Sequence, residues 1–172
     1  MKSDTFRLGE VYDKDFTPDP EMKWMANMPA WLWPKKWRLL GQLAKVLDEQ
    51  VNYGKPNSFK SIPDASKIYN GLSLTVSPKA RGQGLGKEMI RQTMAMAKEL
   101  QCSHVYILAT SIYSQNIFNS IGFEIISNVP YADILDRDGT SPLLKDTREH
   151  KNVQIVTYNL ADEVTTTAVS PL

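Results

Sequence analysis

The stretch that decides the fold reads Leu72-Ser73-Leu74-Thr75-Val76-Ser77-Pro78 and continues, after two residues, as Arg81-Gly82-Gln83-Gly84-Leu85-Gly86. Its first part alternates apolar and polar residues, as a half-buried strand does, and the proline ends that strand. The glycines lead into a segment, Lys87 to about Gln101, with apolar residues at helical spacing. The residues expected to face inward are Ile90, Met94, Ala97 and Leu100. A strand, a glycine turn and a helix are therefore predicted in succession.

A helix that begins directly after a glycine turn can bind an anion. Its first N–H groups have no partner within the helix, and the helix dipole is positive at that end. Glycines let a ligand approach the backbone closely, and Arg81 adds a positive charge at the entrance. The expected guest is a pyrophosphate. The alternative is a strand-to-helix turn that happens to be rich in glycine.

Two common phosphate-binding motifs do not fit the spacing of this turn. A P-loop that ends in Gly86-Lys87 requires a glycine five residues before Gly86, where the sequence has Arg81. A dinucleotide motif that starts with Gly82 and Gly84 requires a third glycine at position 87, which is Lys87. The spacing therefore disfavours a nucleotide-binding protein of either kind.

The residues that follow the predicted helix indicate three strands and a second helix. Strands are expected at His104–Ala109, from Phe123 to Ile126, and at Val153–Tyr158. The second helix is expected at Ser111–Ile121 and ends at Gly122. Strands that alternate with helices in this way predict an α/β fold.

The residues before the decisive stretch indicate one more strand and one more helix. Thr5–Tyr12 alternates as a strand, which must find a partner downstream. All four tryptophans lie between positions 24 and 37, and a helical stripe runs from Trp37 to Val51. The tryptophans can form either an aromatic lid over an amine or ordinary core.

Composition excludes several classes of protein. The 172 residues carry a formal net charge of +1, so no overall field favours nucleic acid or an anionic membrane. No apolar run is long enough to cross a membrane, and no signal peptide is recognisable. One cysteine and two histidines predict neither a disulfide nor a metal site. We expect a cytoplasmic protein whose oligomeric state the sequence leaves open.

The strand and turn at residues 72–86 resemble the acetyl-CoA signature of the GNAT superfamily of N-acetyltransferases. Ala109-Thr110-Ser111-Ile112-Tyr113-Ser114-Gln115-Asn116-Ile117-Phe118, ending in Ile121-Gly122-Phe123, resembles the final helix of that family. The hydroxyl-rich start of this helix is most similar to the insect-type arylalkylamine N-acetyltransferase branch. The resemblance implies a mixed, mostly antiparallel sheet with flanking helices.

The resemblance also implies where acetyl-CoA binds. Main-chain groups of Leu74, Thr75 and Val76 would hold the pantetheine arm between strands that splay apart at Leu74 and Ile107. The pyrophosphate would lie on the glycine turn and the first residues of the helix. The residues implied for it are Arg81, Gly82, Gln83, Gly84, Leu85, Gly86 and Lys87.

The catalytic residues that the resemblance implies are Ser114 and Thr110. Many GNAT enzymes have a tyrosine as the acid where this sequence has Phe118, which cannot donate a proton. The arylalkylamine branch instead has two hydroxyls four residues apart, which match Thr110 and Ser114. The alternative is that these hydroxyls cap the helix.

Cys102 is expected to be structural, His104 exposed and His150 solvated.

Much of the family's amine-binding half, including its glutamate base, has no counterpart before Met1. We therefore expect an N-terminally truncated GNAT domain at residues 1–160 and a disordered tail at 161–172. Glu10 and Asp13 match no family position and are expected to be solvated. The expected activity is acetyl transfer from acetyl-CoA to a primary amine, an arylalkylamine above all. The alternative is a non-catalytic chain that binds CoA or regulates a partner.

Overall fold

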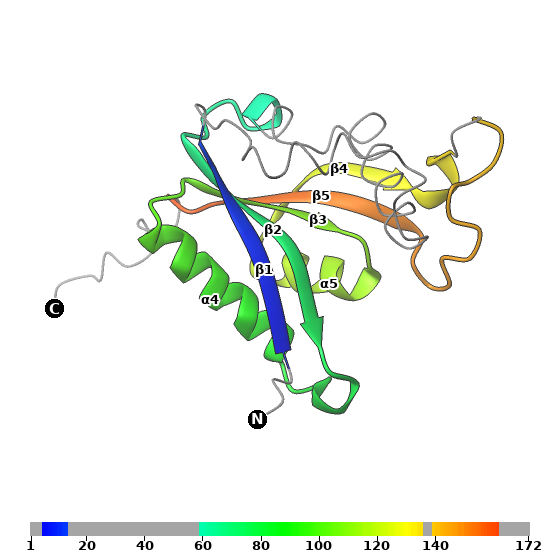
Figure 1. Ribbon diagram of the computed structural model, residues 1–172, viewed down its shortest axis with the longest axis horizontal. Coiled ribbons are helices and arrows are strands. Elements are labelled where there is room, and N and C mark those ends of the chain that lie inside the picture. Colours follow the sequence, from blue (N-terminus) through cyan, green and yellow to red (C-terminus); the bar gives the residue numbers. More distant parts are fainter. Residues whose placement is uncertain (1–4, 14–58, 136–138, 162–172) are drawn as a thin grey trace, which may run out of the picture.

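A computed structural model of the chain describes residues 5–13, 59–135 and 139–161. The described residues form a five-stranded sheet in the order β1-β2-β3-β5-β4, with two α-helices beside it (Figure 1). The strands are β1 Thr5–Asp13, β2 Lys67–Val76, β3 His104–Ala109, β4 Glu124–Pro130 and β5 Asn152–Asn159. The helices are α4 Leu85–Glu99 and α5 Ile112–Ile121.

The first strand finds its partner in the decisive stretch, as its alternation requires. β1 pairs antiparallel with β2, from Thr5 opposite Val76 to Asp13 opposite Lys67. The register shifts between Leu8 and Gly9. A side chain at Gly9 would collide with Tyr69, because a Cβ there would overlap the phenol oxygen and the adjoining ring atoms.

The sheet contains both parallel and antiparallel pairs of strands. β2 and β3 are parallel, whereas β3 with β5 and β4 with β5 are antiparallel. The prediction of a mixed, mostly antiparallel sheet is thus confirmed. The parallel pairing is short: it runs from Ile68 opposite His104 to Gly71 opposite Ile107 and goes no further. Beyond that point β2 and β3 diverge (Figure 1).

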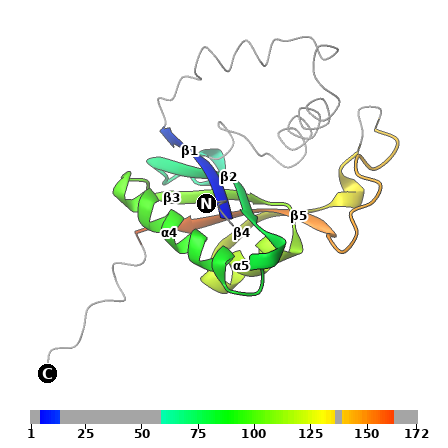
Figure 2. The same cartoon turned by 60° about the horizontal axis from the view of Figure 1, so that its bottom comes forward.

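The helices α4 and α5 cover one face of this sheet (Figure 2). Ile90, Met94 and Ala97 of α4 are buried in a core that also includes Val105, Ile107 and Phe118. Alternate strand residues face the other way into a second core, which includes Ile68, Tyr106, Val153, Ile155 and Tyr131. The period-two pattern of the strands therefore supplies both cores.

Two details of the predicted helix were wrong. It begins at Leu85 rather than Lys87, since Gly84 is its N-cap and the glycine turn passes directly into it. Leu100 is 41% exposed rather than inward, because the helix ends at Glu99 and Leu100 is already its C-cap. The third inner position of the stripe is Ala97, which is fully buried.

The expectation that His104 is exposed was also wrong. His104 is 5% exposed, because it is the first residue of β3, and β3 pairs with a strand on each side. The imidazole Nδ1 lies 3.0 Å from Ser103 Oγ, and Nε2 lies 3.8 Å from an Asp64 carboxylate oxygen. His104 therefore joins the start of β3 to the segment before β2.

Several expectations fall outside the described residues. These are the helix between positions 37 and 51, the tryptophan segment and the C-terminal tail from residue 162. The fourth strand, expected from Phe123, begins at Glu124 and extends to Pro130, while Phe123 is buried among the helices. No helix of the described part is long and apolar enough to cross a membrane.

Candidate acetyl-CoA and amine site

The divergence of β2 and β3 leaves strand backbone without a strand partner. Residues 73–76 of β2 pair with β1 on one edge only, and Leu72 is skipped at the register shift. On the β3 side, no strand of the described residues pairs with them. Backbone N–H and C=O groups that face such a gap need another partner. An extended, polar ligand arm that lies in the gap can supply it.

The glycine turn stands where β2 ends. A short 3-10 helix, η2 Pro78–Ala80, leads into it, and Arg81 is extended and exposed. Gly82 and Gly84 have φ values of 78° and 75°, a region that strongly favours glycine. Nothing lies within 4 Å of where a Cβ would be at either glycine. The turn therefore leaves open space directly above its backbone.

The first turn of α4 presents its N–H groups to this space. Gly84 caps the helix without a side chain, and the first intrahelical bond runs from the Glu88 N–H to the Gly84 carbonyl, at 3.1 Å. Helix geometry leaves the N–H groups of residues 85–87 without a partner inside the helix. Gly86 packs against α5, since a Cβ there would lie 2.8 Å from Ile117 Cδ1.

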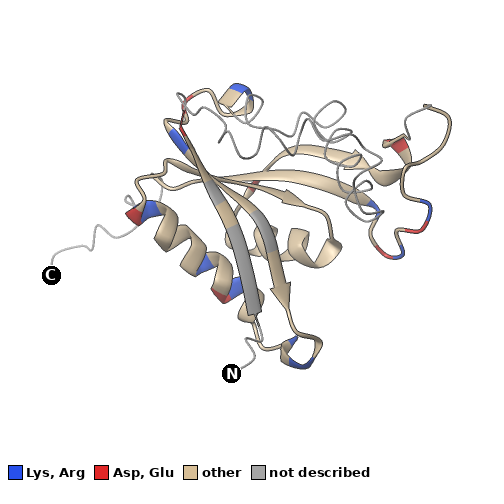
Figure 3. Ribbon diagram, in the orientation of Figure 1, with Lys and Arg blue, Asp and Glu red and all other residues tan. Residues whose placement is uncertain are grey.

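Several basic residues lie around this helix start, whose first turn also carries Glu88. Figure 3 shows lysine and arginine at the turn and along α4. Lys87 donates to the Ser120 carbonyl at 3.2 Å, which fixes it between α4 and α5. It also borders a groove of about 300 Å³ that Arg91 and Lys98 share. The positive charge of the turn and helix favours an anionic ligand group.

The two candidate catalytic hydroxyls lie at the start of α5. Ser111 is the N-cap, and its Oγ accepts from the Ser114 N–H at 3.2 Å. The Ser114 Oγ accepts from the Ser111 N–H at 3.3 Å and donates to the Ser111 carbonyl at 2.8 Å. The two serines thus form a reciprocal capping box. Thr110 precedes it and is exposed.

Two buried side chains fix the backbone around these hydroxyls. The Tyr131 hydroxyl donates to the Thr110 carbonyl at 2.7 Å. Gln115 donates to the carbonyls of Ala109, at 3.2 Å, and Asn152, at 2.8 Å. The end of β3, the start of α5 and the start of β5 are therefore held together. Phe118, which has no proton to donate, is 3% exposed and part of the core.

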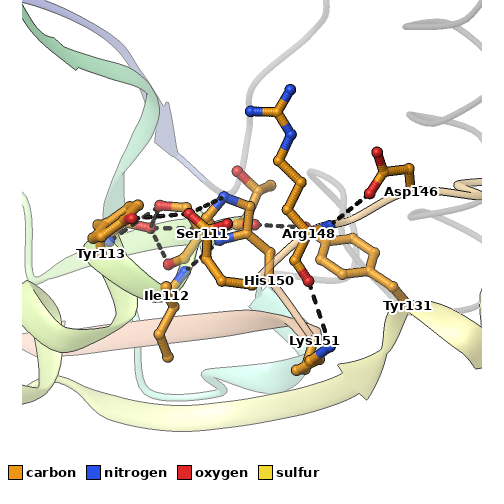
Figure 4. Close-up of polar contacts among 11 residues, drawn as sticks. Ser111, Ile112, Tyr113, Tyr131, Asp146, Arg148, His150 and Lys151 are labelled. Carbon is orange, nitrogen blue, oxygen red and sulfur yellow. Dashed lines mark hydrogen bonds and ion pairs between the residues drawn. The ribbon is translucent and has the colours of Figure 1, made fainter. Parts of the chain in front are cut away.

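Sequence reasoning missed a group of titratable residues beside the serines. The expectation that His150 is solvated was wrong: its Nδ1 accepts from the Ile112 N–H at 3.3 Å, and its side chain is 27% exposed. Its ring meets that of Tyr113 edge to face, with centroids 5.7 Å apart (Figure 4). The Tyr113 hydroxyl donates to Glu149 Oε1 at 2.8 Å. These residues are 36 to 38 positions apart, so no local pattern links them.

These contacts shift the pKa values of Tyr113 and Glu149. The hydrogen bond to the Glu149 carboxylate raises the pKa of Tyr113, and the positive charge of Arg81 acts in the opposite sense. Hydrogen bonds from its own backbone and from Tyr113 lower the pKa of Glu149. Glu149 is therefore anionic at neutral pH.

Comparison with known proteins decides the family. The profile of the Acetyltransferase (GNAT) family matches residues 6–123, more than two thirds of the chain. The chain belongs to the GNAT acetyltransferase family. The activity of this family is acetyl-CoA-dependent acetyl transfer. No curated protein matches the sequence.

Solved insect acetyltransferases share the fold of this GNAT chain. Arylalkylamine N-acetyltransferase 2 from Aedes aegypti is 19% identical, with a TM-score of 0.71 and coverage of 91% of this chain and 68% of the other. Drosophila melanogaster polyamine N-acetyltransferase, which catalyses the formation of N-acetylagmatine, is also 19% identical, with a TM-score of 0.68 and coverage of 90% and 68%. At this identity the similarity shows the fold.

The GNAT fold brings some of the predicted site residues together. The residues at positions 74–76 and 81–87 form one continuous edge, from the strand gap across the glycine turn into α4. Ser114 lies at the start of the other helix, with Thr110 just before it. The two carboxylates near the N-terminus, Glu10 and Asp13, belong to β1. In the sheet, β2 lies between β1 and β3. Among the described residues, no group of histidine, cysteine, aspartate and glutamate could hold a metal ion.

Proposed function

We propose that this GNAT chain transfers the acetyl group of acetyl-CoA to a primary amine, and that the amine is an arylalkylamine. The observation that carries the proposal is the gap between β2 and β3, which opens beside a glycine turn and a helix N-terminus. An extended arm that ends in a pyrophosphate fits that combination of exposed backbone and open, positive turn. The amine class rests on the family branch that the α5 sequence resembles.

Each part of acetyl-CoA has a place in this proposal. The pantetheine arm lies along the backbone of Leu74, Thr75 and Val76, and the pyrophosphate on the N–H groups of residues 83–87. Arg81 is exposed at the entrance, where its guanidinium can bind a phosphate oxygen. The thioester then lies towards the start of α5, near the capping serines.

The chemistry requires little from the chain once both substrates are bound. The ammonium group of the acceptor first releases one proton to solvent, and the neutral amine nitrogen then attacks the thioester carbonyl carbon. The carbon–sulfur bond breaks, the nitrogen loses a second proton as the amide forms, and one proton reaches the departing thiolate. Since a thiol pKa is about 8.5, that proton is a modest demand. Ser114 is the proposed donor, with Thr110 as the second hydroxyl.

The direct test is a calorimetric titration of the folded chain with acetyl-CoA. Saturable one-to-one binding is expected, and Arg81→Glu should abolish it, because the substitution places a carboxylate against the pyrophosphate. Lys60→Glu is the matched control, since Lys60 is an exposed basic residue outside the turn. Unchanged affinity in Arg81→Glu would contradict the proposed binding mode. Turnover of a panel of arylalkylamines follows.

A non-catalytic chain that binds CoA is the second candidate. One observation favours it: the Ser114 hydroxyl is engaged on all sides by the capping box, with its hydrogen on the Ser111 carbonyl. Such a chain would bind acetyl-CoA in the titration but acetylate none of the amines. Turnover of any amine would exclude this candidate.

A further inference from the structure

The start of α5 carries a negative charge that the proposed chemistry has not used. The Glu149 carboxylate accepts a hydrogen bond from Tyr113, and among the described residues no lysine or arginine lies within 4.0 Å of it. The imidazole Nε2 of His150 is 3.9 Å away. The carboxylate is also exposed to solvent. Arg148, the preceding residue, acts on it electrostatically, but in the described part of the chain no lysine or arginine forms an ion pair with it.

The tautomer of His150 leaves that charge in place. Since Nδ1 accepts the Ile112 N–H, the neutral imidazole carries its hydrogen on Nε2, on the side of Glu149. The edge-to-face contact with Tyr113 fixes the ring in this orientation (Figure 4).

The position of the carboxylate relates it to the acetyl-CoA site. Tyr113, which holds it, is the second residue of α5 and lies between Ser111 and Ser114 in sequence. In the proposed binding mode the charge of Arg81 is directed to the pyrophosphate. An incoming ammonium group meets the Glu149 carboxylate beside the start of α5, with the Tyr113 ring next to it for a cation–π contact.

We propose that Glu149, positioned by Tyr113, binds the ammonium group of the acceptor amine and selects amines without a carboxylate next to the nitrogen. An α-amino acid presents its own carboxylate to Glu149 and is repelled, whereas the corresponding decarboxylated amine is not. This inference rests on the proposed function, because it assigns the acceptor side of the same site. Glu149 here orients and recruits the amine and moves no proton.

The experiment compares tyramine with tyrosine as acceptors, which differ only by the carboxylate. Acetyl-CoA turnover is measured for the wild-type chain, Glu149→Gln, Glu149→Asp and Tyr113→Phe. Glu124→Gln is the matched control, an exposed carboxylate at the opposite end of α5. In parallel, calorimetry measures tyramine binding to each chain saturated with CoA, which needs no turnover.

Glu149→Gln should raise the KM for tyramine about fivefold, as expected for loss of an exposed ion pair, with little change in kcat. The preference for tyramine over tyrosine should fall by a similar factor. Glu149→Asp should retain most of the affinity, Tyr113→Phe should lie between, and Glu124→Gln should match the wild type. Acetyl-CoA affinity should be the same in all variants.

The outcomes separate this inference from the proposed function. If the wild type acetylates tyramine but Glu149→Gln has an unchanged KM and preference, the inference is overturned while the function stands. If no chain turns over, the proposed function fails. In that case equal calorimetric affinity of wild type and Glu149→Gln for tyramine overturns the inference, and weaker binding by the variant supports it.

Discussion

At the scale of single residues, the start of α5 combines structural and chemical demands on the same atoms. Ser114 closes a capping box with Ser111, and a capping hydroxyl contributes about 1 kcal/mol to helix stability. A proton donor at the same position must release its hydrogen bond to the Ser111 carbonyl, at 2.8 Å, during the reaction. The two roles predict different behaviour of one substitution.

Ser114→Ala should lower kcat by about a hundredfold, the low end for a general acid because the thiolate leaves readily, without weakening acetyl-CoA binding. Steady-state kinetics and calorimetry on the same preparation check this. Ser120→Ala is the matched control, since Ser120 bonds the Ile117 carbonyl at the other end of the same helix. An equal loss of turnover and acetyl-CoA affinity, together with a lower Tm, would instead assign Ser114 to capping.

At the scale of elements, the site exists because β2 is shared between two partners of unequal length. β1 pairs with it from end to end, while β3 pairs with only its first residues, up to Gly71. The long β1 ladder keeps the far end of β2 extended where β3 no longer supports it. The integrity of the β1–β2 ladder should therefore control acetyl-CoA binding.

Gly9→Ala tests this dependence. Its Cβ would overlap the hydroxyl oxygen and two ring atoms of the buried Tyr69, so the side chain or the strand must shift at a cost of about 1–3 kcal/mol. Chemical denaturation should report the lost stability, and calorimetry should report weaker acetyl-CoA binding. Asp13→Ala, an exposed position of the same strand, is the control. Full stability in Gly9→Ala would show that the ladder adapts without strain.

At the scale of the whole molecule, buried titratable groups couple stability to alkaline pH. Burial raises the pKa of Tyr131, whose hydroxyl anchors the Thr110 carbonyl, and burial likewise raises the pKa of Cys102. A group whose pKa is higher in the folded state binds its proton more tightly there. Its contribution is therefore complete below the unfolded pKa and is lost as pH rises through the folded value.

Stability should accordingly begin to decline as pH rises above about 8.5, the ordinary pKa of cysteine, and should decline further above about 10, that of tyrosine. Tyr131→Phe should cost about 1 kcal/mol at pH 7, because the Thr110 carbonyl loses its donor, and should flatten the decline at alkaline pH. Denaturant melts at several pH values measure both effects. Cys102→Ala separates the thiol from the phenol. An identical slope in Tyr131→Phe would contradict a role for this residue.

Local patterns in the sequence predicted most of the elements that the structure describes, and the strand, turn and helix of the proposed acetyl-CoA site. The alternation of apolar and polar residues predicted the strands, and helical spacing predicted α4 and α5. The glycines at positions 82 and 84 predicted the turn, and both have the positive φ values that favour glycine. These features depend on neighbours within a few residues, so a linear pattern contains them. The resemblance to the GNAT family rests on the same stretches.

Only the tertiary structure decided how far β2 and β3 stay paired, and which distant groups meet at α5. The burial of His104 follows from strands on both sides of β3. The contact of Tyr113 with Glu149 follows from the path of the chain between β4 and β5. Such contacts join residues more than thirty positions apart, and their free energy depends on the packing of the whole sheet. No periodicity in the sequence could specify them.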